Sequence, residues 1–101
     1  MIEELDNDID QYNELVKGFK ALSSSDYTTA YNLSQDAIIL ADRWNEIMLN
    51  SVKYSKELEV TKSDFTSYAY QKFKILMKIH DFCRVVYRQG SYVGLEETWK
   101  D

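Results

Sequence analysis

The sequence predicts an all-α protein that folds as an antiparallel three-helix bundle. Apolar residues recur at spacings of three and four along most of the chain, which is the period of a helix with one buried face. Proline is absent and glycine occurs only three times, so the strongest helix breakers are almost missing. The chain has 101 residues, of which 45% are hydrophobic and 29% are charged. This size and composition indicate a single globular domain over residues 1–101.

The first helix is expected over residues 2–22. Acidic residues crowd its first turns, where the helix dipole favours negative charge, and Lys17 and Lys20 lie near its other end. Its apolar residues form a heptad stripe that predicts packing against other helices. The stripe consists of Ile2, Leu5, Ile9, Tyr12, Val16 and Phe19.

The second helix is expected over residues 26–60. Its apolar face is wide enough to need two neighbouring helices rather than one. We favour one continuous helix, which would be about 52 Å long. The alternative is a break near Asn50-Ser51. A continuous helix would overhang the first, and a second copy of the chain would cover the overhang, so we expect a homo-oligomer.

The third helix is expected over residues 64–89, with Gly90 as the residue that ends it. Lys72 falls within the apolar arc of this helix, so its side chain must reach solvent, pair with an acid or face a partner. Beyond Gly90, apolar residues at i, i+3 and i+7 predict a short docked segment, which could form a fourth short helix. These residues are Tyr92, Leu95 and Trp99.

Charge is unevenly distributed along the chain, whose net charge is −5. Residues 1–61 contain twelve acidic and five basic side chains, a net charge of −7. Residues 62–90 contain six basic and two acidic ones, a net charge of +4. Two explanations stay open: neighbouring helices attract each other inside the bundle, or one of the charged surfaces binds a partner.

No set of residues predicts catalysis, metal binding or a cofactor, and we expect the protein not to be an enzyme. Cys83 lies one helical turn from His80, but on the apolar face, where a cysteine is inert packing, and Asp81 points away from it. Residues 6–10 resemble the start of a calcium loop, but the required glycine and final glutamate are replaced by Gln11 and Lys17. One cysteine and one histidine exclude a Cys/His zinc cage.

The longest strictly apolar run covers only residues 37–41. That run is too short for a membrane span or for the apolar region of a secretory signal. We therefore expect a cytoplasmic protein with no membrane partner.

The acidic side chains of the first helix are the first candidate binding surface. Regularly spaced carboxylates can occupy a groove that is built for phosphates. We therefore expect a small interaction protein, an adaptor or inhibitor, whose partner is another protein and could belong to a nucleic-acid-processing complex. The residue usage of this chain is typical of an AT-rich genome, which fits a phage or mobile-element accessory protein. The candidate residues are Glu3, Glu4, Asp6, Asp8, Asp10 and Glu14.

The basic side of the third helix is the second candidate surface. Basic side chains contact phosphates and a tyrosine ring can stack on a base, so the alternative function is binding of single-stranded nucleic acid. The acidic isoelectric point, near 4.8, argues against this alternative. A further alternative is a structural subunit of a larger assembly. The candidate nucleic-acid-binding residues are Tyr70, Lys74, Lys78, Arg84 and Arg88.

Overall fold

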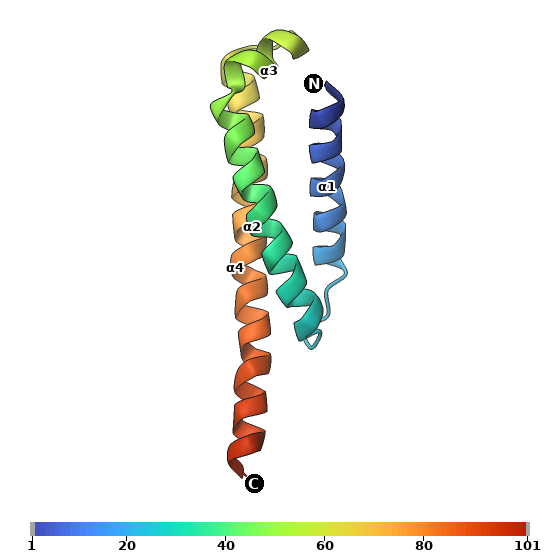
Figure 1. Ribbon diagram of the computed structural model, residues 1–101, viewed down its shortest axis with the longest axis vertical. Coiled ribbons are helices and arrows are strands. Elements are labelled where there is room, and N and C mark those ends of the chain that lie inside the picture. The colour runs from blue at the N-terminus through green and yellow to red at the C-terminus, as the bar shows by residue number, and fades with distance from the viewer. Residues whose placement is uncertain (1, 101) are drawn as a thin grey trace.

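The computed structural model describes the backbone of residues 2–100 and the side chains of residues 3–89. The described residues form four helices and no strand, so the predicted all-α class is confirmed. Three of the helices, α1 (Ile2–Lys20), α2 (Tyr27–Leu49) and α4 (Lys62–Lys100), form an antiparallel bundle in which each runs opposite to the one before it (Figure 1). The short helix α3 (Ser51–Leu58) crosses one end of this bundle.

Helices α2 and α4 form the closest pair in the bundle, and α1 lies farther from both (Figure 1). Small residues explain the difference. Ala30, Ala37 and Ala41 are fully buried on α2, and Ala69 is fully buried on α4. Because these side chains add little bulk, the two backbones can approach closely, whereas α1 packs through larger side chains.

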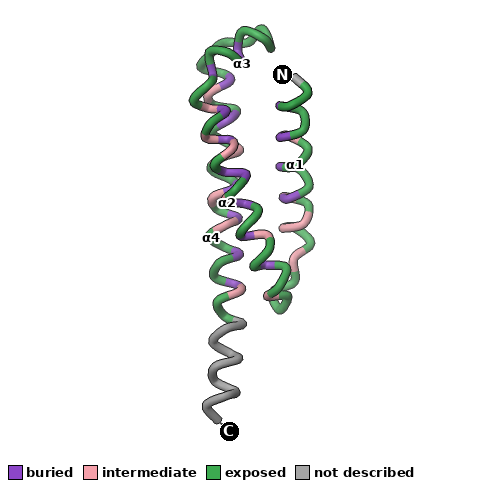
Figure 2. The backbone as a smooth tube through the Cα atoms, in the orientation of Figure 1, coloured by how far each residue is buried: buried purple, intermediate pink, exposed green. Residues whose placement is uncertain are grey.

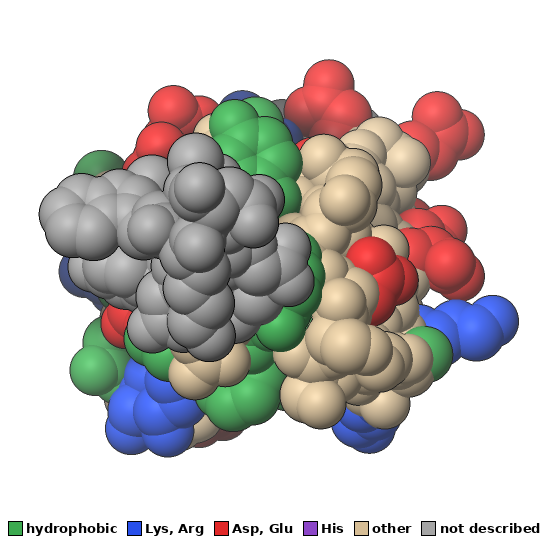
Figure 3. Space-filling model, turned by 90° about the horizontal axis from the view of Figure 1, so that it is seen from below, with side chains coloured by type: hydrophobic (Ala, Val, Ile, Leu, Met, Phe, Trp, Pro, Cys, Tyr) green, Lys and Arg blue, Asp and Glu red, His purple; other side chains and the backbone are tan. Residues whose placement is uncertain are grey.

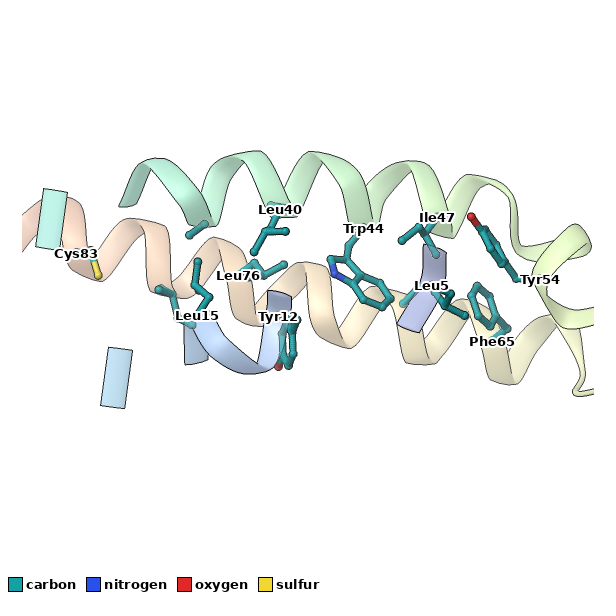
Figure 4. Packing of buried hydrophobic residues seen from close by; sticks show 14 of the residues in the cluster. Leu5, Tyr12, Leu15, Leu40, Trp44, Ile47, Tyr54, Phe65, Leu76 and Cys83 are labelled. Carbon is teal, nitrogen blue, oxygen red and sulfur yellow. The ribbon is translucent and has the colours of Figure 1, made fainter. Parts of the chain in front are cut away.

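Trp44 lies at the centre of the core, fully buried between the three long helices (Figure 4). Its ring meets Tyr12 of α1 edge-on, with centroids 6.4 Å apart, and Tyr68 of α4, with centroids 6.0 Å apart. Edge-to-face contacts of this kind are favourable for aromatic rings. Buried residues line the inward faces of the helices along the bundle, and exposed residues cover the outside (Figure 2).

Local polar groups set where the helices begin. The Asp26 carboxylate accepts a hydrogen bond from the backbone N–H of Thr29 at 3.1 Å and caps α2. The Thr61 hydroxyl accepts one from the N–H of Asp64 at 3.0 Å and caps α4. Helix α1 ends at Lys20, two residues before the predicted end at residue 22.

The prediction of one continuous helix over residues 26–60 is wrong, because the helix breaks at Asn50 as in the alternative. The Asn50 backbone leaves the helical region, with φ −102° and ψ 28°. Its side-chain amide donates to the Glu46 carbonyl at 3.0 Å, and the Ser51 hydroxyl donates to the Met48 carbonyl. Side chains that bond to these carbonyls compete with the helical ladder and permit the bend into α3.

The prediction that Gly90 ends the third helix is also wrong, because α4 continues to Lys100 and is about 58 Å long. A glycine ends a helix when it adopts a left-handed conformation, and no glycine in the described backbone has a positive φ. Inside a helix it costs only about 1 kcal/mol relative to alanine. No separate fourth helix follows, and the docking predicted for the Tyr92, Leu95 and Trp99 side chains lies outside the described side chains.

Candidate functional site

The acidic surface consists of the five exposed carboxylates on α1. In Figure 3, acidic side chains lie on the right, the side on which Figure 1 shows α1, and also along the upper edge. The surface comprises Glu3, Glu4, Asp6, Asp10 and Glu14.

The sixth candidate, Asp8, does not belong to this surface, which corrects the sequence interpretation. Asp8 is only 6% exposed, and its Oδ2 accepts a hydrogen bond from Arg43 Nε of α2 at 3.1 Å. It follows Leu5 by three residues and precedes Tyr12 by four, so it lies on the buried face of α1. That spacing was the signal in the sequence that could have identified Asp8 as an interhelical residue.

A groove of about 470 Å³ runs between α1 and α2 beside the acidic surface. Its apolar lining comes from both helices, and Ile39 at its edge is 65% exposed. Carboxylates from Asp10, Glu14 and Asp36 also line it, and no lysine or arginine does. The residues that line the groove are Asp10, Gln11, Glu14, Leu15, Leu33, Asp36, Ile39 and Leu40.

Sequence reasoning did not identify this groove. Ile39 follows Ile38 and lies off the heptad positions of its helix, and a large apolar residue in that position is the signal that could have marked it. Asp36 lies three residues before Ile39, on the same side of α2. The groove therefore combines exposed apolar surface with negative charge, which a heptad pattern alone does not reveal.

The basic surface lies on α4, on the side opposite its buried residues. All five predicted residues are exposed there, within an arc of about 120° on a helical wheel. The same arc contains Asp81, the one carboxylate between residues 70 and 89. The structure thus brings together the predicted basic residues Tyr70, Lys74, Lys78, Arg84 and Arg88.

Lys72 is held inside the bundle by three aromatic rings. Its Nζ lies 4.1 Å from the ring centroid of Tyr12, 4.7 Å from that of Tyr68 and 5.8 Å from that of Trp44. Contact between an ammonium group and aromatic faces stabilises the cation. Burial lowers the pKa of Lys72, and among the described residues it forms no ion pair with a carboxylate. Lys72 therefore joins α4 to α1 and α2.

The residues examined for catalysis do not form a connected set. His80 Nδ1 donates a hydrogen bond to the Ser34 carbonyl at 2.9 Å and lies 3.0 Å from the Ser34 hydroxyl. Cys83 is fully buried, and burial raises the pKa of its thiol. Asp81 is exposed on the far side of the helix. Among the described residues, no group of three or more His, Cys, Asp or Glu side chains could hold a metal ion.

Within the described part of the chain, no helix has both the length and the apolarity needed to cross a membrane. The chain matches no protein-family model, no curated protein and no solved structure. Its function is therefore inferred from the groove and the two charged surfaces themselves.

Proposed function

We propose that the protein is a non-enzymatic interaction module, an adaptor or inhibitor, that binds a basic amphipathic helical segment of a protein partner. The observation that carries this proposal is the groove between α1 and α2. Its apolar lining offers contact area for the apolar side of such a helix, and its three carboxylates attract the basic side.

The groove supports a peptide ligand better than a small molecule. Two helix faces form it, and its charged groups are all carboxylates. Amphipathic helices bind in such grooves through apolar anchors at helical spacing, while charges at the rim set orientation and exclude wrong partners. The exposed carboxylates that continue along α1, Glu3, Glu4 and Asp6, extend the same field and would steer a basic segment toward the groove.

The proposal is tested with a fluorescently labelled helical peptide of lysine and leucine, with leucines on one face and lysines on the other. Fluorescence anisotropy measures its affinity for the wild-type chain and for a groove variant that combines Glu14→Lys and Asp36→Lys. We expect the groove variant to bind about tenfold more weakly, because each exposed charge contact contributes about 0.2–1 kcal/mol and reversal turns attraction into repulsion.

Asp42→Lys is the control, because Asp42 is an exposed carboxylate on α2 that does not line the groove. It changes the net charge in the same direction, by half as much as the groove variant does, and should weaken binding far less than half as much. Equal losses in the control and the groove variant, or no binding to the wild-type chain at low salt, would contradict the proposal.

The basic surface supports a second candidate, binding of single-stranded nucleic acid. Four exposed cations on one face of α4 can contact successive phosphates, and the exposed Tyr70 ring can stack on a base. A labelled oligothymidine titration should then give an affinity that falls steeply with added salt, because cations are released from the phosphates. Lys78→Glu should reduce that affinity and the salt dependence. No binding at low salt would dismiss this candidate.

A further inference from the structure

The chain itself carries a basic amphipathic strip of the kind that the groove fits. Lys74, Lys78, Phe82 and Val85 follow one another on α4 at spacings of four, four and three, so they lie along one side of the helix. Phe82 is 55% exposed and Val85 is 57% exposed, although both are large apolar residues. The edge-to-face contact of the Phe82 ring with Phe19, at 5.5 Å between centroids, holds the ring in place. We call these four residues the α4 strip.

We propose that the groove of one molecule binds the α4 strip of a second copy of the chain. The inference rests on the proposed function, since it names the basic amphipathic helix that the groove receives. Charge complementarity supports it, because Lys74 and Lys78 would meet a groove whose charged residues are all acidic. Apolar complementarity supports it too, because the exposed rings and methyl groups of Phe82 and Val85 would cover the exposed Ile39.

The positions of the two surfaces determine how copies would be arranged. No residue of α4 lines the groove, which opens between α1 and α2, whereas the α4 strip lies on α4, where Phe82 contacts Phe19 of α1. The two surfaces share no residue, so the contact is head-to-tail. After one contact, a pair of molecules keeps one free groove and one free α4 strip, and further copies would extend it into an open chain.

The first experiment measures mass against concentration by sedimentation velocity. We expect the weight-average mass of the wild-type chain to rise continuously with concentration at low salt. At about 1 M salt, where charges are screened beyond about 3 Å, the association should weaken at least tenfold. A wild-type chain that stays monomeric at low salt and at concentrations of several hundred micromolar would overturn the inference.

The second experiment uses two variants that each lose one half of the contact. The groove variant, Glu14→Lys with Asp36→Lys, keeps a normal α4 strip. The strip variant, Lys74→Glu with Lys78→Glu, keeps a normal groove. Each alone should be monomeric, and their mixture should associate, because the normal groove of one variant receives the normal strip of the other and the basic groove receives the acidic strip. A chain carrying all four substitutions should associate again, since both charges are reversed.

Circular dichroism first verifies that each variant is folded, and Asp42→Lys serves as the control that should associate like the wild type. A groove variant or strip variant that alone associates as the wild type does, or a mixture of the two that stays monomeric, would overturn the inference. If the wild-type chain stays monomeric while its groove still binds the lysine–leucine peptide, the second-copy inference fails and the proposed function stands. If the groove binds neither a second copy nor the lysine–leucine peptide, the second-copy inference and the proposed function both fail.

Discussion

Replacing Asp8 with asparagine tests how α1 is held to the rest of the bundle. The change keeps the size of the side chain but removes its negative charge. Arg43 Nε donates to the Asp8 carboxylate at 3.1 Å, and Asp8 is almost fully buried. In the variant, Arg43 loses its principal counter-charge, and its remaining ion pair is the contact with exposed Glu46, at 3.7 Å.

The expected loss lies between the values for exposed and buried ion pairs. Removing one member of a fully buried pair costs about 3–5 kcal/mol, whereas exposed pairs contribute about 0–1 kcal/mol. The Arg43 side chain is 36% exposed, so water can solvate its guanidinium after the change. We therefore expect Asp8→Asn to lower the free energy of unfolding by about 1–2 kcal/mol, which corresponds to roughly 4–16 °C in the melting temperature of a chain of this size.

Urea denaturation followed by circular dichroism measures the loss, with Asp6→Asn as the matched control. Asp6 lies on the same helix, two residues away, but is exposed, so its variant should stay within about 0.5 kcal/mol of the wild type. A double-mutant cycle with Arg43→Gln should give a coupling energy near 1 kcal/mol. Equal stabilities of the Asp8 and Asp6 variants, or a coupling near zero, would refute the assignment of Asp8 as an interhelical anchor.

Three further predictions follow from single contacts. A double-mutant cycle of Lys72→Met and Tyr12→Leu, measured by urea denaturation, should show a coupling energy of about 0.5–1 kcal/mol, because the Lys72 ammonium contacts the Tyr12 ring. Strictly additive losses of stability would refute this contact. Cys83 is fully buried, and burial raises the pKa of its thiol. Iodoacetamide at mildly alkaline pH should therefore label the folded chain at least about a hundredfold more slowly than the urea-unfolded chain. Comparable labelling rates would contradict the burial of Cys83. The hydrogen bond from Thr29 lowers the pKa of Asp26 below 3.8, so the cap stabilises the fold above that pH and loses its effect as the pH falls through the lower folded-state value. Asp26→Asn keeps a neutral acceptor and should make acid unfolding less dependent on pH in that window, and an unchanged acid transition would contradict the cap.

The helical class was predictable because the dominant signal, apolar spacing, acts over whole segments. Burial of a helix face depends on many residues at once, so the pattern tolerates exceptions such as Ser34 and Ser51, which are buried in the bundle. The break at Asn50 depends instead on a few hydrogen bonds, which the apolar pattern does not encode. Gly90 lies inside α4, because a glycine can adopt the helical conformation as well as the left-handed one that ends a helix, and the sequence does not show which it adopts.

The candidate surfaces were predictable in composition but not in boundary. Five of the six predicted acidic residues on α1 are exposed, because charged side chains are mostly found in contact with solvent. Asp8 differs only through a partner 35 residues away, and no local pattern records that contact. The groove escaped prediction for the same reason, since Glu14 and Asp36 belong to different helices and meet only in the folded chain.

The acidic groove exists only while α1 is docked, because α1 supplies one of its walls. Three contacts along its length anchor α1: Asp8 binds Arg43, Tyr12 contacts Lys72 and Phe19 packs against Phe82. A ligand that fills the groove binds only molecules in which α1 is docked. By thermodynamic linkage, the ligand stabilises the docked state by the same free energy by which docking of α1 strengthens ligand binding. At a hundred times its dissociation constant such a ligand would add about 2.7 kcal/mol. The contacts that dock α1 therefore also maintain the groove in which a ligand would bind.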